Sequence, residues 1–462
     1  MIKNLSNLKE NKMGVMPINR LLIGMALPMM LSMVVQALYN VVDSIFVSQI
    51  SSTDNYALTA LSAAFPMQNL MIAVATGTGV GINALLSRSL GEKNYKNANR
   101  AAANGVLLGI ISSVVFSIIC IFGSKAFVAT QTDIPEVVQY GTDYLTICGG
   151  ASIGLFIQIM FERLLQSTGK TVFSMITQLI GALTNIVLDY CMIFGKFGFP
   201  EMGVKGAAAA TVIGQIVAAV AGMILHFVFN KEIRMKISDL IPSKKIIGRI
   251  YRVGVPSILM ASIGSVMTFC MNIILDPLVA DGIAVAVFGV YFKLQSFIFM
   301  PVFGLNSGMV PIISYNYGAR NPDRIKKTIK LGIIYACCIM FVGLLIFQLA
   351  PETLLQMFNA NSEMITVGKT ALRIISISYV FAGVCVICGT AFQALDASKY
   401  SLFVSVARQL LVLIPVAWLI ATLTHNVDMV WFAFPIAEIA SLTASLIFIR
   451  KTLKQRLTPL YD

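Results

Sequence analysis

Polar residues that could bind a cation share single helical faces in two apolar stretches of the N-terminal half. In the first stretch, Gln36, Asn40 and Asp43 are spaced i, i+4 and i+7, which brings them to one face of a helix. In the second, Asn185 and Asp189 share a face in the same way. A carboxylate inside a membrane helix costs at least ~2.5 kcal/mol, and such residues are functional-site candidates.

The two carboxylates suggest chemistry with small cations. Asp43 lies near the end of the first apolar stretch and Asp189 near the end of the fifth, so both can reach one depth. Two carboxylates held together in a low dielectric do not both stay charged easily, which favours proton uptake. Carboxylate and amide oxygens are also hard ligands for a small metal cation. The residues support a cation site and leave H⁺ and Na⁺ open; the alternative is that each acid makes a structural contact.

The composition is that of a membrane protein. Of the 462 residues, 57% are hydrophobic and 12% are charged, a balance that no soluble domain can bury. The formal net charge of +13 could indicate nucleic acid. The Lys and Arg residues cluster in short loops between apolar runs, however, so we expect no nucleic-acid partner.

Twelve apolar segments follow one another along the chain. Most exceed the ~20 residues needed to cross the hydrocarbon core, and without water to satisfy the backbone they should be helices. We therefore expect an all-α integral membrane protein with twelve transmembrane helices. The approximate limits of the segments are 21–47, 57–87, 101–123, 138–161, 171–195, 205–229, 250–276, 283–311, 331–350, 367–394, 400–423 and 429–449.

The basic residues predict the orientation. The loops after the even-numbered segments, with the N-terminal arm and the tail from Arg450, hold nearly all of the Lys and Arg. The positive-inside rule then places both termini in the cytoplasm. The longest basic connector, 230–249, separates an N-terminal six-helix bundle at 1–229 from a C-terminal six-helix bundle at 250–462.

The two halves repeat at a nearly constant offset. Pro28 in the first segment corresponds to Pro256 in the seventh, and SRSLGEKN at 87–94 parallels SYNYGARN at 314–321. The glutamines of LLQSTGK and AFQALDASK, Gln166 and Gln393, correspond in the same way. Six helices in each half make the repeats parallel, so a pseudo-two-fold axis along the membrane normal should relate them. This is a transporter architecture with the substrate path between the halves.

Together these motifs resemble the multidrug and toxic compound extrusion (MATE) family, nearer its bacterial MepA- and DinF-like branches. The resemblance rests on ALPMM and QALYNVVDSIFV in the first segment, the SRSLGEKN and LLQSTGK loops, TNIVLDY in the fifth segment and the duplicated layout. It implies a cation-coupled antiporter of a bacterial cell membrane that exports amphipathic, often cationic compounds on a proton or sodium gradient. The family's cation site implies Asp43, Asn185 and Asp189, with Thr211 as the best match for a threonine of the sixth helix.

The repeat predicts that this site exists in one half alone. At the offset that relates Pro28 to Pro256, Asp43 corresponds to Met271, and Asp189 falls near Trp418. The C-terminal bundle therefore lacks the acid pair, and coupling should reside in the N-terminal bundle. No cofactor is expected besides H⁺ or Na⁺ as the coupling ion.

Charged residues also fall inside the C-terminal segments. Lys293, Arg408 and Glu438 each lie roughly in the middle of a predicted span. Intramembrane charges of opposite sign normally pair, so we expect Glu438 to pair with Lys293 or Arg408. Such a pair could be a structural bridge or have a substrate or gating role.

Two prolines and a set of polar residues complete the candidates. Pro28 and Pro256 each remove a backbone hydrogen bond and should kink their helices. A bend at Pro28 that changes when a cation binds is one hypothesis, and a fixed kink is the other. The polar side chains expected to face a substrate cavity are Gln36, Tyr39, Asn40, Asn69, Gln158 and Gln295.

Other functions fit the sequence less well. A lipid-linked oligosaccharide flippase of the same superfamily would need a strongly cationic cavity. An intramembrane enzyme would need a nucleophile with a base or a metal cluster, yet His226 and His425 cannot easily join the carboxylates. A channel would not call for a two-lobed repeat with an acid pair in one lobe. Gly169–Thr171 resembles the end of a P-loop, but Leu164 stands where the first glycine belongs, so ATP is not expected. We expect a monomer in the lipid bilayer.

Overall fold

The computed structural model describes residues 11–50, 56–279, 282–358 and 360–461. All regular structure in these ranges is helical, with no strand. The first ten residues of the predicted N-terminal bundle and the last residue of the C-terminal one lie outside the described residues.

In the N-terminal half, one short helix precedes a series of long ones. These helices are α1 (Lys12–Val15), α2 (Ile18–Ser48), α3 (Tyr56–Gly91), α4 (Tyr95–Ala129), α5 (Pro135–Gly150), α6 (Ile153–Ser167), α7 (Thr171–Ile193) and α8 (Gly203–Phe229).

The C-terminal half contains more breaks. Its helices are α9 (Lys244–Leu275), α10 (Ile283–Gly318), α11 (Pro322–Leu349), α12 (Pro351–Gln356), α13 (Ser362–Ser376), α14 (Tyr379–Ala394), α15 (Ser398–Val406), a π-helical segment (Ala407–Leu413), α16 (Ile414–Thr424), α17 (Val427–Val430) and α18 (Ala433–Leu457). The π-helical segment precedes Pro415, which has no N–H to donate to a carbonyl of the preceding turn.

The structure has twelve membrane spans if each bent helix pair counts as one. Within the described residues, ten single stretches are long and apolar enough to cross a bilayer. The fourth and tenth spans are broken instead: α5 and α6 meet at 46°, and α13 and α14 at 49°. The two breaks, at 151–152 and 377–378, fall at equivalent places of the two halves, so the sequence repeat is also a structural repeat. The prediction of twelve helices in two parallel repeats is confirmed.

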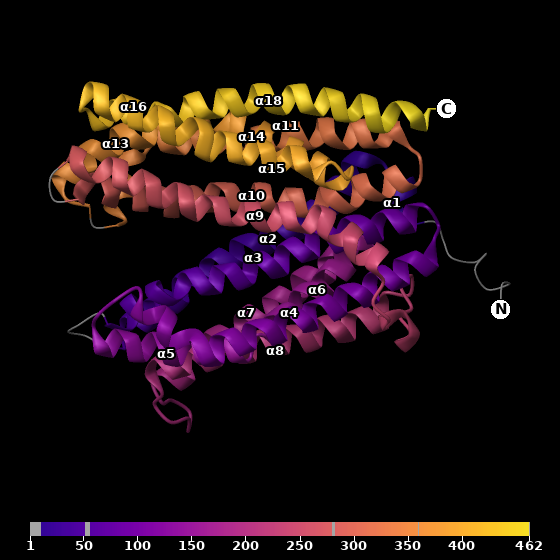
Figure 1. Ribbon diagram of the computed structural model, residues 1–462, viewed down its shortest axis with the longest axis horizontal. Coiled ribbons are helices and arrows are strands. Elements are labelled where there is room, and N and C mark those ends of the chain that lie inside the picture. Colours follow the sequence, from indigo (N-terminus) through magenta and orange to yellow (C-terminus); the bar gives the residue numbers. More distant parts are fainter. Residues whose placement is uncertain (1–10, 51–55, 280–281, 359, 462) are drawn as a thin grey trace.

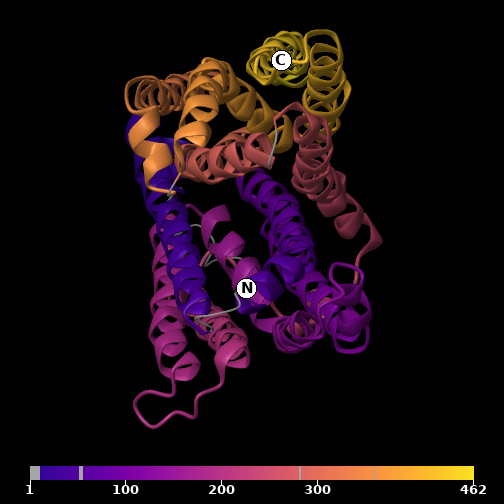
Figure 2. The same cartoon turned by 90° about the vertical axis from the view of Figure 1, so that its left-hand side faces the viewer.

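The two halves form separate helical bundles. Figure 2, seen end-on, shows the N-terminal helices on one side and the C-terminal helices on the other. We call α2–α8 the N-lobe and α9–α18 the C-lobe. The start of α2 and the end of α18 lie at the same end of the molecule (Figure 1). We call it the basic end, because the helix ends and loops there hold most of the Lys and Arg residues.

The connector between the lobes lies along α4 of the N-lobe. The Asn104 side chain donates to the Asp239 carbonyl (3.0 Å) and accepts from the Ser243 N–H (2.9 Å). The Arg234 N–H donates to the Asn99 side chain (2.9 Å). The helix of the seventh span, α9, begins at Lys244, before the predicted start at 250. The connector is thus shorter than 230–249.

Two glycines let the lobes touch at the basic end. Gly91 ends α3 and Gly318 ends α10, and each faces the backbone of the other helix. A Cβ on Gly91 would lie 2.0 Å from the Tyr315 carbonyl oxygen, and one on Gly318 would lie 2.1 Å from that of Arg88. Arg88 and Tyr315 are equivalent positions of the two repeats, as are the two glycines, so the contact is reciprocal. Only residues without a side chain fit there.

The segment around α1 touches both lobes at the same end. The Arg324 guanidinium of the C-lobe donates to the carbonyl oxygens of Met13 (3.0 Å) and Met16 (2.7 Å). The Asn11 side chain donates to the Thr168 carbonyl oxygen of the N-lobe (3.3 Å) and to the Glu232 carboxylate of the connector (2.7 Å). Burial raises the pKa of Glu232, and the hydrogen bond from Asn11 opposes that shift. The segment therefore bridges the lobes by hydrogen bonds where they already touch.

Candidate cation site in the N-lobe

Asp43 of α2 and Asp189 of α7 come together inside the N-lobe. Asp189 is fully buried. The two carboxyl groups lie within reach of a hydrogen bond that one shared proton would provide. Within the described residues, neither oxygen of Asp189 nor Oδ1 of Asp43 accepts a hydrogen bond. Buried acceptors normally have partners, so the pair is arranged for a ligand with positive charge.

Asn185 and Thr211 lie beside the carboxylates and contact each other. The Asn185 amide donates to the Thr211 hydroxyl (3.4 Å), and both side chains are buried. This contact depends on close packing of α7 on α8. A Cβ on Gly214 would lie 2.9 Å from the Gly181 carbonyl oxygen. Gly181 therefore serves helix packing as well as continuing the polar face of α7. All four residues implied by the family resemblance are thus in one place, while their role in coupling stays a prediction.

Aromatic rings pack together next to the carboxylates, on the side away from the basic end. Phe46 follows Asp43 by about one turn of α2, and its ring centroid lies 6.2 Å from that of Tyr190. The Phe46 ring also meets that of Phe194 edge-on, at 6.1 Å. These contacts hold α2 against α7 beside the acid pair.

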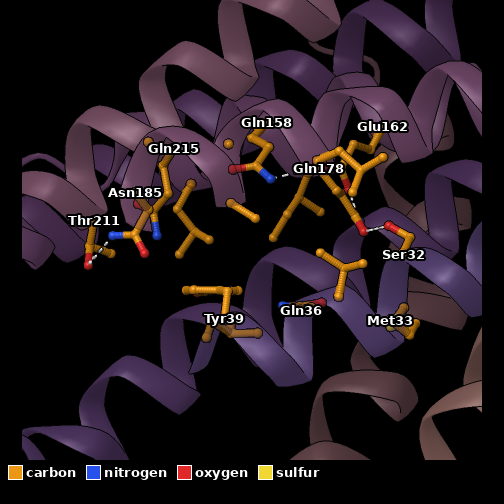
Figure 3. A pocket seen from close by; sticks show the side chains of 18 of the residues that line it. Ser32, Met33, Gln36, Tyr39, Gln158, Glu162, Gln178, Asn185, Thr211 and Gln215 are labelled. Carbon is orange, nitrogen blue, oxygen red and sulfur yellow. Dashed lines mark hydrogen bonds between the residues drawn. The ribbon is translucent and has the colours of Figure 1, made fainter. Parts of the chain in front are cut away.

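A cavity of about 130 Å³ extends from Asn185 and Thr211 toward the basic end. Figure 3 shows α2 on one side of it and α6, α7 and α8 on the other. Three of the predicted cavity residues, Gln36, Tyr39 and Gln158, line it. The other three, Asn40, Asn69 and Gln295, are not among its lining residues.

The cavity also contains two ionisable residues that the sequence did not reveal as site residues, Glu162 and Arg163. The predicted fourth span ended at 161, so both residues fell into a basic loop. In the structure α6 continues to Ser167 and buries both side chains. The helix therefore ends later than its apolar run, because α6 continues for six residues past Phe161. The sequence signal that could have revealed them is an acid next to a base, directly after an apolar run, in FERLLQ.

In the C-lobe, Glu438 pairs with Arg408 and not with Lys293. The Arg408 guanidinium lies 3.3 Å from the nearer Glu438 oxygen, and Glu438 is buried. The Lys293 ammonium lies instead over the Phe358 ring, at 5.9 Å from the centroid. Arg408 belongs to the π-helical segment, an irregularity that is often found at functional sites.

We expect Glu438→Gln to lower the stability of the folded protein by about 3 kcal/mol, because it leaves the Arg408 charge without its partner in a poorly hydrated place. Glu352→Gln is the control, since the Glu352–Lys369 pair lies at the surface and should contribute at most about 1 kcal/mol. Thermal unfolding in detergent measures both. Equal melting temperatures would contradict the prediction. Arg408→Met with Glu438→Leu separates the two roles: a structural bridge allows transport to survive, and a gating role does not.

The prolines lie where the repeat predicts, inside α2 and α9. Both helices continue without interruption through Pro28 and Pro256. The hypothesis that the bend at Pro28 changes when a cation binds stays a prediction.

Two parallel six-helix repeats with a pair of facing carboxylates inside one of them are the architecture of a secondary membrane transporter. The family model described as MatE matches the chain twice, over residues 28–191 and 256–419. The two matches begin at the equivalent prolines, Pro28 and Pro256, and together span well over half of the chain. The chain belongs to the MATE family, a family of transporters and not of enzymes.

Relatives and solved structures agree with this assignment. The multidrug export protein MepA of Staphylococcus haemolyticus (strain JCSC1435) is 24% identical over 94% of this chain and 93% of its own length. The probable multidrug resistance protein NorM of Thermotoga maritima is 28% identical over 79% of this chain and 78% of its own. A solved outward-facing conformation of a multidrug resistance MATE family transporter has the same fold, with a TM-score of 0.90, 23% identity, and coverage of 97% of this chain and 98% of that one.

Proposed function

We propose that this protein is an antiporter that exports amphipathic, often cationic compounds and is driven by inward movement of H⁺ or Na⁺. The observation that carries the proposal is the pair of the half-buried Asp43 and the buried Asp189, in which three of the four carboxylate oxygens accept no hydrogen bond among the described residues. A cation that binds there from one side and leaves on the other supplies the energy for export. The relatives named as a multidrug export protein and as a probable multidrug resistance protein support drugs as the class of substrate.

The proposed transporter is a monomer in a bacterial cell membrane, with the basic end in the cytoplasm. The loops of the basic end are rich in Lys and Arg, which the positive-inside rule assigns to the cytoplasm. The lobes touch at this end, so the structure corresponds to a state closed toward the cytoplasm. Export would then alternate between this state and one in which the lobes separate there.

Efflux from liposomes tests the proposal. The purified protein is reconstituted with ethidium, a fluorescent cation, inside the vesicles, and a pH gradient or a Na⁺ gradient is imposed separately. Efflux should accelerate with one of the two gradients and fall to the protein-free rate when an ionophore removes it. Efflux that ignores both gradients would refute coupling.

The cavity does not favour a flippase. Phosphate headgroups need several cationic side chains, and Arg163 is accompanied there by the acid Glu162 among mostly neutral residues. A dye-labelled anionic lipid offered to the same vesicles should therefore stay in its leaflet.

A further inference from the structure

Glu162 of α6 is a buried acid without an ion-pair partner among the described residues. Its side chain is only 4% exposed. One carboxylate oxygen accepts from the Gln158 amide (2.9 Å) and the other from the Gln178 amide (2.7 Å). Figure 3 shows these residues at one end of the cavity. The salt bridges of the described residues do not include Glu162.

The two amides are oriented to hold a charged carboxylate. The Ser32 hydroxyl of α2 donates to the Gln178 carbonyl oxygen, which turns the Gln178 N–H toward Glu162. A carboxylate has about four acceptor positions, and the amides use two. Fixed donors of this kind stabilise negative charge on an acid, and they leave Glu162 with free acceptor positions next to a cavity.

The neighbouring cation does not neutralise Glu162. Adjacent residues of a helix do not face one another. The Arg163 guanidinium instead donates to the Gln166 side chain (2.9 Å). Its aliphatic part packs on Gly79 of α3, where a Cβ would lie 2.8 Å from the Arg163 Cγ. Arg163 is therefore held against α3 and makes no ion pair with Glu162, which leaves the cavity side of the carboxylate open to another cation.

The size of the cavity limits what can enter. Its volume is about 130 Å³. Pockets for whole drug-sized ligands measure about 300–1,000 Å³. In this state the cavity can hold a small hydrated cation or the ammonium head of a larger molecule.

Glu162 is too far from the acid pair to share one ligand with it. Gln178, its hydrogen-bond partner, precedes Asp189 by about three turns of α7, or about 16 Å along the helix. At the offset that relates Gly91 to Gly318, Glu162 corresponds to Gly389, so the C-lobe has no equivalent acid. The N-lobe alone thus contains carboxylates at two depths.

We propose that Glu162, oriented by Gln158 and Gln178, is a second cation-binding site of the N-lobe, between the acid pair and the basic end. It binds a monovalent cation, which is either the ammonium group of an exported compound or the coupling ion on its way to the cytoplasm. This inference rests on the proposed antiport function.

Binding to the purified full-length protein tests the site, with Glu162→Gln as the variant. Glu136→Gln is the matched control, because Glu136 is an exposed acid of α5 in the same broken span. One arm titrates dansylcadaverine, a fluorescent dye with a primary ammonium head, and, for comparison, the uncharged dye Nile red. The other measures ²²Na⁺ binding and proton uptake on acidification.

An ammonium site predicts that Glu162→Gln weakens dansylcadaverine binding at least roughly tenfold, with Nile red unchanged. An ion site predicts one fewer Na⁺ or proton bound per protein, with dansylcadaverine unchanged. Glu162→Asp keeps the charge and should restore part of either loss. If Glu162→Gln does not fold, the variants Glu162→Asp and Ser32→Ala replace it. Each should then show a smaller loss of binding, in the same one of the two measurements. Binding equal to that of Glu136→Gln in both arms would overturn the inference.

Asp43→Asn distinguishes this failure from failure of the proposed function. If Asp43→Asn abolishes gradient-driven efflux while Glu162→Gln binds every probe normally, the second site is wrong and the antiporter stands. If neither variant changes efflux or binding, both are wrong.

Discussion

Asp43→Asn should abolish the gradient-driven part of ethidium efflux and leave the protein folded. Asparagine has the size of aspartate, so the packing of α2 on α7 is kept. What is lost is the negative charge next to Asp189, and with it the proton or metal ion that the pair would share. A hydrogen bond to a charged group contributes about 1.5–3 kcal/mol, which predicts roughly tenfold to hundredfold weaker cation binding.

Asp143→Asn is the matched control for this prediction. Asp143 lies in the same lobe and pairs with Lys205 at the surface (3.4 Å), where such pairs contribute little. Efflux rates in liposomes under the driving gradient, with melting temperatures of both variants, give the comparison. Similar efflux rates for the two variants would refute a coupling role for Asp43.

Asp189→Asn should have the same effect, and the double variant should be no worse than either single one. Residues that act as a unit give non-additive losses. Additive losses would mean that the two carboxylates bind separate ions.

Gly318→Ala should prevent the lobes from closing at the basic end. The added Cβ would lie 2.1 Å from the Arg88 carbonyl oxygen, and backbone atoms on both helix ends cannot turn aside as a side chain would. Overpacking of this kind costs about 1–3 kcal/mol, which shifts the population of the closed state by roughly 5- to 150-fold. Because a transporter must visit both the closed and the open state, the efflux rate should fall as the population of the closed state falls.

Spin labels at Lys96 and Lys327, exposed residues of α4 and α11 on opposite lobes, measure the effect as a longer distance between the lobes. The native cysteines are removed first. Gly289→Ala is the control, because it lies in the same helix α10 with no atom within 4 Å of the added Cβ. Gly91→Ala should repeat the result from the other lobe. A distance distribution for Gly318→Ala that matches Gly289→Ala would count against the prediction.

The number of spans and the repeat could be predicted from sequence because both depend on local, cumulative signals. A long apolar run leaves few alternatives to a helix in a membrane. Asp43 and Asp189 were found in the same way, since each stands out against an apolar face and helical spacing is regular. Their approach to each other was expected from depth alone, and in the structure the contact of Phe46 with Tyr190 holds α2 against α7 beside them.

Features that depend on how helices face one another could not be predicted. Asn69 and Gln295 are polar residues in spans, just as Gln158 is, but the packing of the lobes decides which of them lines the N-lobe cavity. From the sequence, Arg408 and Lys293 were equal candidates for the partner of Glu438. In the structure the partner is Arg408, which lies in the π-helical segment. Glu162 was missed because α6 continues beyond the apolar run to Ser167 and buries a residue that the sequence placed in a loop.

The reciprocal contact of Gly91 and Gly318 has a consequence for the history of the chain. In a dimer with two-fold symmetry, residue i of one subunit touches j of the other, and j touches i in return. Positions 88 and 91 of the first repeat and positions 315 and 318 of the second still meet in this pattern. A single six-helix ancestor with one such glycine could therefore have assembled with a second copy of itself before the gene was duplicated. The acid pair present in one repeat alone would then mark a later division of labour between the two copies.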